Sequence, residues 1–81
     1  MIEVGQIIHF FSKIDVAIVE LRLALAVGDR IAIKGPNTDF EQTVESMQID
    51  RKSITQAEAG QSIGLKLFQP AKERDAVYKK L

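Results

Sequence analysis

The segments LAVGDRI at residues 25–31 and AGQSIGL at residues 59–65 decide how this sequence is expected to fold. Each places a glycine and polar residues directly before a run in which apolar residues alternate. Glycine adopts positive φ without a Cβ clash, and the branched residues after it suit a pleated, half-buried surface. Each segment therefore predicts a turn that leads into a new β-strand.

Further strand-like runs lie on both sides of these turns. Alternating or β-branched residues predict strands over 2–11, 16–21, 30–34, 40–50, 63–67 and 76–78, with a short piece over 54–59. We expect the long strand over 40–50 to be bulged near Ser46 and Met47, because its alternation loses phase there. The segment GPNTD at residues 35–39 predicts an exposed loop tip.

One stretch, from Ile14 to Val27, also fits helical spacing. Leu, Ala, Glu and Arg are good helix formers, so local propensity alone does not decide between helix and strand. Val16, Ile18 and Val19 favour a strand because their χ1 angles are crowded in a helix, and no capping box follows Asp15.

Length and composition predict one small domain over residues 1–81. The chain has 46% hydrophobic residues and no cysteine, which excludes disulfides and thiolate metal sites. Eleven basic residues balance eleven acidic ones, so no net positive field draws the domain toward nucleic acid. No apolar run is long enough to span a bilayer, and the N-terminal residues lack the features of a signal peptide. We expect a cytoplasmic protein without membrane contact.

The order of three pieces, LAVGDRIAI at 25–33, VESMQ at 44–48 and AGQSIGL at 59–65, resembles the second domain of translational GTPases such as elongation factor Tu. The resemblance extends from about Ile2 to about Tyr78. It implies an all-β fold, a small closed antiparallel β-barrel of six or seven strands. The phosphate-binding loop G-x-x-x-x-G-K-[ST] is absent, so no nucleotide binding is expected from this chain alone. In the closing turn Asp75 and Ala76 replace a glycine of the family, so that turn needs another geometry or positive φ at Asp75.

The search for catalytic groups points to no enzyme. The single histidine, His9, lies in an expected strand with neither cysteine nor an evident serine elbow to accompany it. Acidic residues such as Glu20, Glu41 and Asp50 have the spacing of solvated strand faces and turns. We predict no catalytic residue, no metal site and no cofactor.

The resemblance also implies candidate binding residues. In elongation factor Tu the corresponding barrel helps to hold the aminoacyl end of tRNA through a glutamate, and Glu45 matches it, between Val44 and Met47. An exposed strand glutamate beside a core methionine is the alternative reading. Related barrels touch ribosomal RNA with basic turns, and phosphate contacts need only a few placed cations. The RNA-binding candidates are therefore Lys13, Lys34, Glu45, Arg51, Lys52 and Lys66, although scattered surface lysines would look the same.

Two functions remain open at this stage. The first is a stand-alone, non-catalytic module that contacts tRNA, the ribosome or a translation-related protein. The second is a protein-interaction or accessory barrel without an RNA role, similar to the barrel that ends some collagenase-like peptidases. A protein-docking barrel should expose an apolar patch, for which Phe40, Phe68 and Tyr78 are candidates, although each also fits a core position.

Overall fold

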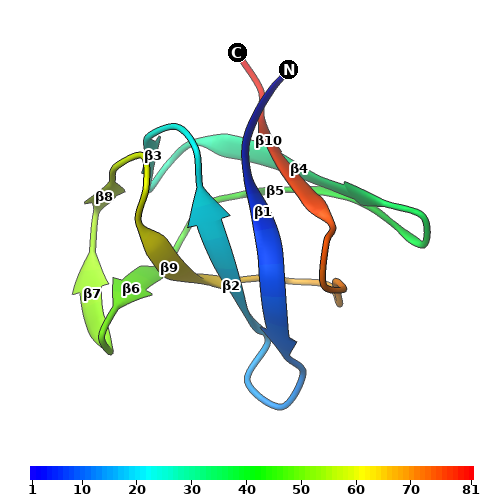
Figure 1. The fold of residues 1–81 in the computed structure, drawn as a ribbon, viewed down its shortest axis with the longest axis horizontal. Coiled ribbons are helices and arrows are strands. Elements are labelled where there is room, and N and C mark those ends of the chain that lie inside the picture. The colour runs from blue at the N-terminus through cyan, green and yellow to red at the C-terminus, as the bar shows by residue number, and fades with distance from the viewer.

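The sheet begins with a hairpin of two strands, β1 (Ile2–Phe11) and β2 (Val16–Leu21). These elements belong to a computed structural model that describes residues 1–81, and they pair antiparallel (Figure 1). Both strands have the predicted bounds, so the helical interpretation of residues 14–27 is wrong. The connecting turn ends at Asp15, which adopts φ 56°.

Eight more strands follow, and every pairing between neighbouring strands is antiparallel. The main sheet has the order β5-β4-β10-β1-β2-β9-β6-β7, and β3 pairs with β8 in a separate ladder. No helix is present, and so none could cross a membrane. The remaining strands are β3 (Leu25–Ala26), β4 (Arg30–Gly35), β5 (Thr38–Thr43), β6 (Met47–Ile49), β7 (Lys52–Ile54), β8 (Gln56–Ala57), β9 (Ser62–Lys66) and β10 (Ala76–Lys79).

The all-β antiparallel prediction is confirmed, but the strand count and the closure are not. Ten strands are present instead of six or seven, because several are only two or three residues long. The main sheet starts at β5 and ends at β7, and no ladder joins these two strands. The sheet is therefore not closed into a barrel by its backbone hydrogen bonds.

The predicted long strand over 40–50 is two strands, β5 and β6, separated by residues 44–46. Val44 stays with the preceding hairpin, because its N–H donates to the Asp29 carbonyl and its own carbonyl accepts from the Gly28 N–H. After Val44 the chain leaves β4 and β6 joins β9 instead. The interruption lies where a bulge was expected, but it is a change of partner strand.

The turns depend on a few residues with positive φ. Gly28 (φ 98°) and Gly60 (φ 90°) adopt the conformation predicted for their two segments. In the closing turn Arg74, with φ 76°, takes the left-handed conformation and Asp75 does not. The expected exposed tip at 35–39 is present but narrower than predicted, since β4 runs to Gly35, β5 begins at Thr38, and only the exposed Pro36 and Asn37 form the turn.

A single core lies inside the curved sheet. It contains 17 buried apolar residues, drawn from most of the strands and from the connecting segments. Phe40 belongs to this core, whereas Phe68 is 56% exposed and Tyr78 is half-buried. The residues with the largest fully buried side chains are Ile7, Leu21, Leu25, Ile31, Ile33, Met47, Ile63, Leu65, Leu67, Val4, Val19 and Val44.

One buried side chain joins two parts of the sheet that no ladder connects. Gln42 on β5 is only 3% exposed. Its Nε2 donates to the Lys66 carbonyl at 2.9 Å, and its Oε1 accepts from the Phe68 N–H, also at 2.9 Å. The amide thus bonds one acceptor and one donor of the backbone at the end of β9, as a neighbouring strand would.

The two ends of the chain lie together. Ile2 pairs with Lys79 where β1 meets β10, and Figure 1 shows both termini at the same pole of the molecule. The turn between β1 and β2 lies at the opposite pole (Figure 1).

Replacing Gln42 with Ala should lower the free energy of unfolding by about 2 kcal/mol, because a buried side chain and its two hydrogen bonds are lost. Urea unfolding followed by circular dichroism measures this change. Gln56→Ala is the matched control, since the Gln56 amide bonds only the exposed Glu58 carboxylate, and it should change stability by less than about 0.5 kcal/mol. A loss below about 1 kcal/mol for Gln42→Ala would contradict the bridging role.

Candidate binding site

A hollow of about 420 Å³ opens on the outer face of the sheet where β2, β9 and β6 meet. Its volume lies in the range of small-molecule or side-chain pockets. The neighbouring turns, between β1 and β2 and between β6 and β7, form its rim. It is lined by Phe11, Ile14, Val16, Ile18, Gln48, Ile49, Asp50, Arg51, Ser62, Ile63 and Gly64.

The period-two alternation of the strands creates the apolar floor of this hollow. Val16 and Ile18 are half-buried on the outer face of β2, while Ala17 and Val19 point into the core. On β9 the outward position between two core residues is Gly64, which has no side chain to fill the space. A Cβ at Gly64 would lie 3.1 Å from Gln48 Cγ and 3.4 Å from Val16 Cγ1. Glycine at this position therefore lets the Gln48 and Val16 side chains pack directly against the β9 backbone at the floor of the hollow.

The side of the hollow opposite β2 is a gap in the ladder. The pairing of β6 with β9 ends at Gln48 and Gly64, and from Ile49 onward β6 pairs only with β7. The Lys66 N–H donates to the Ser46 carbonyl, so even-numbered residues of β9 direct their backbone groups toward β6. Ser62 is next in that series and has no partner residue on β6. Its N–H and carbonyl therefore face the gap.

The turn beside the gap is strained. Asp50 (φ 50°) and Arg51 (φ 67°) are the two loop residues of the β6–β7 hairpin, and Ile49 pairs with Lys52 across them. Two consecutive positive φ values define a type I′ turn, for which Asn-Gly or Asp-Gly is the usual sequence. Arginine in the left-handed conformation costs roughly 1–2 kcal/mol. The strain places a guanidinium group at the rim of the hollow.

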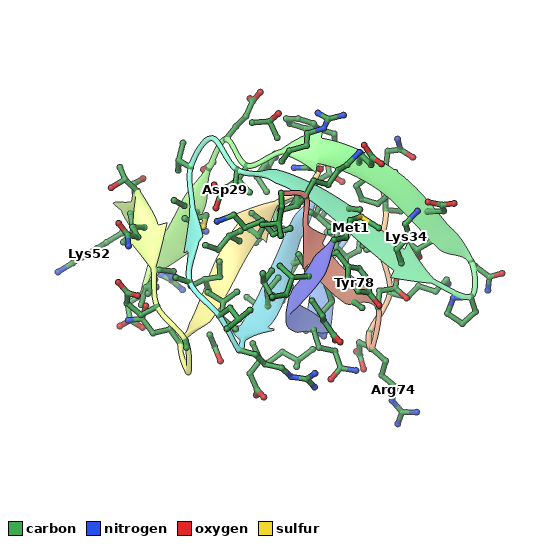
Figure 2. All side chains as sticks on the ribbon, turned by 90° about the horizontal axis from the view of Figure 1, so that it is seen from above. Met1, Asp29, Lys34, Lys52, Arg74 and Tyr78 are labelled. Carbon is green, nitrogen blue, oxygen red and sulfur yellow. The ribbon has the colours of Figure 1, made fainter.

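The six residues predicted as RNA-binding candidates do not lie on one surface of the molecule. Lys34 and Lys52 lie on opposite sides of the molecule (Figure 2). Lys34 on β4 forms an ion pair with Asp39 across the β4–β5 hairpin. Lys34 Nζ also donates a hydrogen bond to Asp39. This bond, with the charges of Asp39 and Glu41, raises the pKa of Lys34 above its ordinary value. Glu45 is exposed after β5, beside the core residues Val44 and Met47.

Of the other four candidates, only Arg51 lines the hollow. Lys13 lies in the turn between β1 and β2, Arg51 and Lys52 belong to the β6–β7 hairpin, and Lys66 ends β9. The Lys66 Nζ donates to the Ile14 carbonyl at 2.9 Å, which brings β9 against the β1–β2 turn. The ion pairs of the structure involve the cations Arg22, Arg30, Lys34, Lys79 and Lys80, so these four have no carboxylate partner.

A separate charged surface covers β4, β5 and β10. The carboxylate of Glu41 lies 3.0 Å from Lys80 Nζ and 3.9 Å from Arg30 Nη2. The hydrogen bond from Lys80, with the charges of Lys80, Arg30 and Lys34, lowers the pKa of Glu41 below its ordinary value. Because its charges are mutually paired, this surface offers little to an external ligand.

His9 has a local structural role. Its Nδ1 lies 3.3 Å from Glu73 Oε2, and its ring packs edge-on against Phe11 with centroids 4.4 Å apart. The structure contains no group of three or more His, Asp or Glu side chains arranged to hold a metal ion.

The sequence analysis missed Gly64, Gln48 and Ser62. A usable signal was present for Gly64, because it occupies an outward position in the clearest alternating run of the chain, residues 63–67. A glycine at such a position marks a place where something can approach the backbone closely. Gln48 and Ser62 gave no signal, since their importance depends on where β6 separates from β9.

Comparisons with known proteins point to peptidases. The chain is 41% identical over 78 residues to an uncharacterized protease of Methanocaldococcus jannaschii, an alignment that covers 95% of this chain and 19% of that protein. The chain thus spans about a fifth of the length of its relative. No family model matches the chain.

Two solved structures share the fold, and both are the C-terminal domain of a protein from Geobacillus thermoleovorans named as a U32 peptidase. A selenomethionine variant has a TM-score of 0.90 at 19% identity and covers 99% of this chain and 100% of that one. The other has a TM-score of 0.89 at 20% identity and covers 96% and 91%. At this level of identity the likeness shows the fold alone.

The resemblance to translational GTPases is therefore wrong, and with it the expected role in translation, at the ribosome or in RNA binding. The motif that suggested it has a structural role. Asp29 Oδ2 accepts from the Ala26 N–H at 2.9 Å and lies 3.3 Å from Lys79 Nζ, while Gly28 supplies positive φ. The Val-Gly-Asp turn thus stabilises the backbone here and does not indicate what the domain binds. The comparisons favour the alternative, an accessory domain of peptidases.

Replacing Arg51 with Gly should raise the free energy of unfolding by about 1 kcal/mol, because glycine adopts φ 67° without the steric cost that arginine bears. Chemical unfolding measures the gain. Arg51→Ala removes the same side chain but keeps a Cβ, so it should give no comparable gain. Equal stabilities of the Gly and Ala variants would contradict the presence of backbone strain at this position.

Proposed function

We propose that this chain is a non-catalytic, protein-binding accessory domain that works with a U32-peptidase-like catalytic part. The observation that carries the proposal is the 41% identity, over nearly the whole chain, to about one fifth of a protease. The remaining four fifths of that relative leave ample length for a catalytic part elsewhere in the polypeptide. The fold supports the same assignment, since both similar structures are C-terminal domains of such a protein.

A binding role also suits the side chains. The hollow combines an apolar floor with hydrogen-bonding groups and two charged side chains, Asp50 and Arg51, which is the composition of a recognition surface. His9 is held on the surface by Glu73 and Phe11, so it is not presented to a nucleophile in the hollow. We therefore assign the chain no catalytic step of its own.

The test uses the relative from Methanocaldococcus jannaschii in three forms: intact, without the matching segment, and with this chain in place of that segment. Binding of fluorescently labelled, unfolded casein is measured by fluorescence anisotropy. The intact and exchanged forms should bind alike, and the form without the segment should bind at least about tenfold more weakly, which corresponds to about 1.4 kcal/mol.

Casein hydrolysis by the isolated 81-residue chain is the accompanying control and should be undetectable. Equal casein binding by all three forms would exclude the accessory role, and hydrolysis by the isolated chain would exclude a non-catalytic one.

A further inference from the structure

We propose that the pole of the domain where the two chain ends meet is the surface that packs against the catalytic part with which the domain works. The inference rests on the proposed function, because it names the side of the accessory domain that faces its catalytic neighbour. This pole faces the viewer in Figure 2. It carries the exposed apolar residues Ile2 and Leu23 and a small recess of about 170 Å³, which we call the terminal recess. The recess is lined by Ala24, Leu25, Ala26, Asp29, Gln56 and Lys79.

Backbone pairing places the two exposed apolar residues next to the terminal recess. Ile2 pairs with Lys79, which lines the recess. The Leu23 N–H donates to the Val4 carbonyl at 3.3 Å, and the following residue, Ala24, also lines the recess. Ile2 is 42% exposed and Leu23 is 40% exposed. Each therefore presents a large apolar side chain to solvent from a backbone position that its pairing holds in place.

Two ion pairs border these apolar residues. Lys79 Nζ lies 3.3 Å from Asp29 Oδ2 at the recess, and Arg22 Nη1 donates to Glu3 Oε2 at 3.3 Å beside Leu23. The four charges cancel, so they favour neither an acidic nor a basic ligand. An apolar, uncharged patch of a folded protein would cover Ile2 and Leu23 and leave both ion pairs at the rim, which is the usual arrangement of a protein interface.

The length of the relative identifies the occupant. The matching segment is 19% of one polypeptide, and the alignment covers 95% of this chain. The other four fifths of that polypeptide are therefore joined to the segment close to positions that correspond to one or both ends of this chain. Both ends lie at this pole, where Ile2 pairs with Lys79 (Figure 1). A catalytic part attached there begins next to the exposed apolar residues.

Covalent attachment makes a small apolar face sufficient for docking. A short connection holds the attached part at an effective concentration on the order of 1 mM, so the contact needs little affinity of its own. Interfaces between the domains of one chain are accordingly modest, about 600–1,500 Å², and more polar than permanent interfaces between subunits. A second copy of the domain would have to bind the same face without this advantage. We therefore assign the face to the catalytic part.

The experiment measures side-chain exposure by hydroxyl-radical labelling and mass spectrometry. It compares the 81-residue chain alone with the relative from Methanocaldococcus jannaschii that carries this chain in place of its matching segment. Labelling of Leu23 should fall at least about fivefold in the exchanged form, as expected for a side chain in the covered centre of an interface. Leu23 is the decisive residue, because it is distant in sequence from both ends and attachment alone does not cover it. Ile14, which is 54% exposed in the β1–β2 turn, should be labelled equally in both proteins.

A matched pair of variants tests whether apolar contact holds the two parts together. In the exchanged form Ile2→Asp should return the labelling of Leu23 to its level in the isolated chain, because a carboxylate is costly to bury in an apolar interface. Ile14→Asp is the control: it places the same carboxylate at an exposed apolar position of the opposite pole, and Leu23 should stay protected. Thermal melting of the isolated chain with each substitution shows whether the domain remains folded.

Equal labelling of Leu23 in the two proteins, protection of Ile14 in its place, or equal effects of Ile2→Asp and Ile14→Asp would overturn the inference. Protection of Leu23 that grows with the concentration of the isolated chain would also overturn it, because a second copy would then be the occupant.

The casein experiment separates the two proposals. If the exchanged form binds casein as the intact relative does while Leu23 stays exposed, the accessory role stands and this pole is not the docking surface. If Leu23 is covered but all forms of the relative bind casein equally, the docking surface stands and the accessory role in protein binding fails.

Discussion

The fold depends on a side-chain amide that takes the place of a strand. Gln42 is buried in β5, and its two hydrogen bonds hold the backbone of Lys66 and Phe68 where no ladder reaches. A buried donor or acceptor without a partner costs about 1–3 kcal/mol, so the buried Gln42 amide needs these two backbone groups. Such a link matters for the stability of a small domain with a modest core, because it holds the curved sheet in place around that core.

The candidate site also results from interrupted pairing between strands. At one end of β9 the missing neighbour is replaced by Gln42, and at the other end β6 turns away and Ser62 is left facing the gap. Gly64 lies between these ends, and its missing side chain lets Gln48 and Val16 pack against the backbone of β9. Apolar surface, the backbone groups of Ser62 and the charged side chains of Asp50 and Arg51 therefore lie together beside this part of β9.

Local sequence patterns predicted the regular parts of the fold well. The strands of the first hairpin have their predicted bounds because β-branched and aromatic residues together make up more than half of them, and Gly28 and Gly60 have the positive φ that their turns required. The strand over 40–50 was wrong because Val44 and Met47 are both core residues that pair with different strands. Gln42 and the gap at Ser62 could not be predicted, since each depends on residues distant in the sequence. The Val-Gly-Asp turn misled for another reason, because its glycine and aspartate stabilise the backbone of this fold and say nothing about what the domain binds.

The long first strand has a mechanical consequence. Ile2 lies beside Lys79 at one pole, and Phe11, nine residues further along β1, lines the hollow. At about 3.3 Å per residue the strand separates the two by about 30 Å. Any polypeptide that continues from either end would therefore be attached at the pole opposite the β1–β2 turn, far from the hollow. The length of that connecting polypeptide would then set the effective concentration of a ligand bound in the hollow near whatever lies at the other end of the connection. A longer or shorter connection would change this concentration without any change in the binding surface.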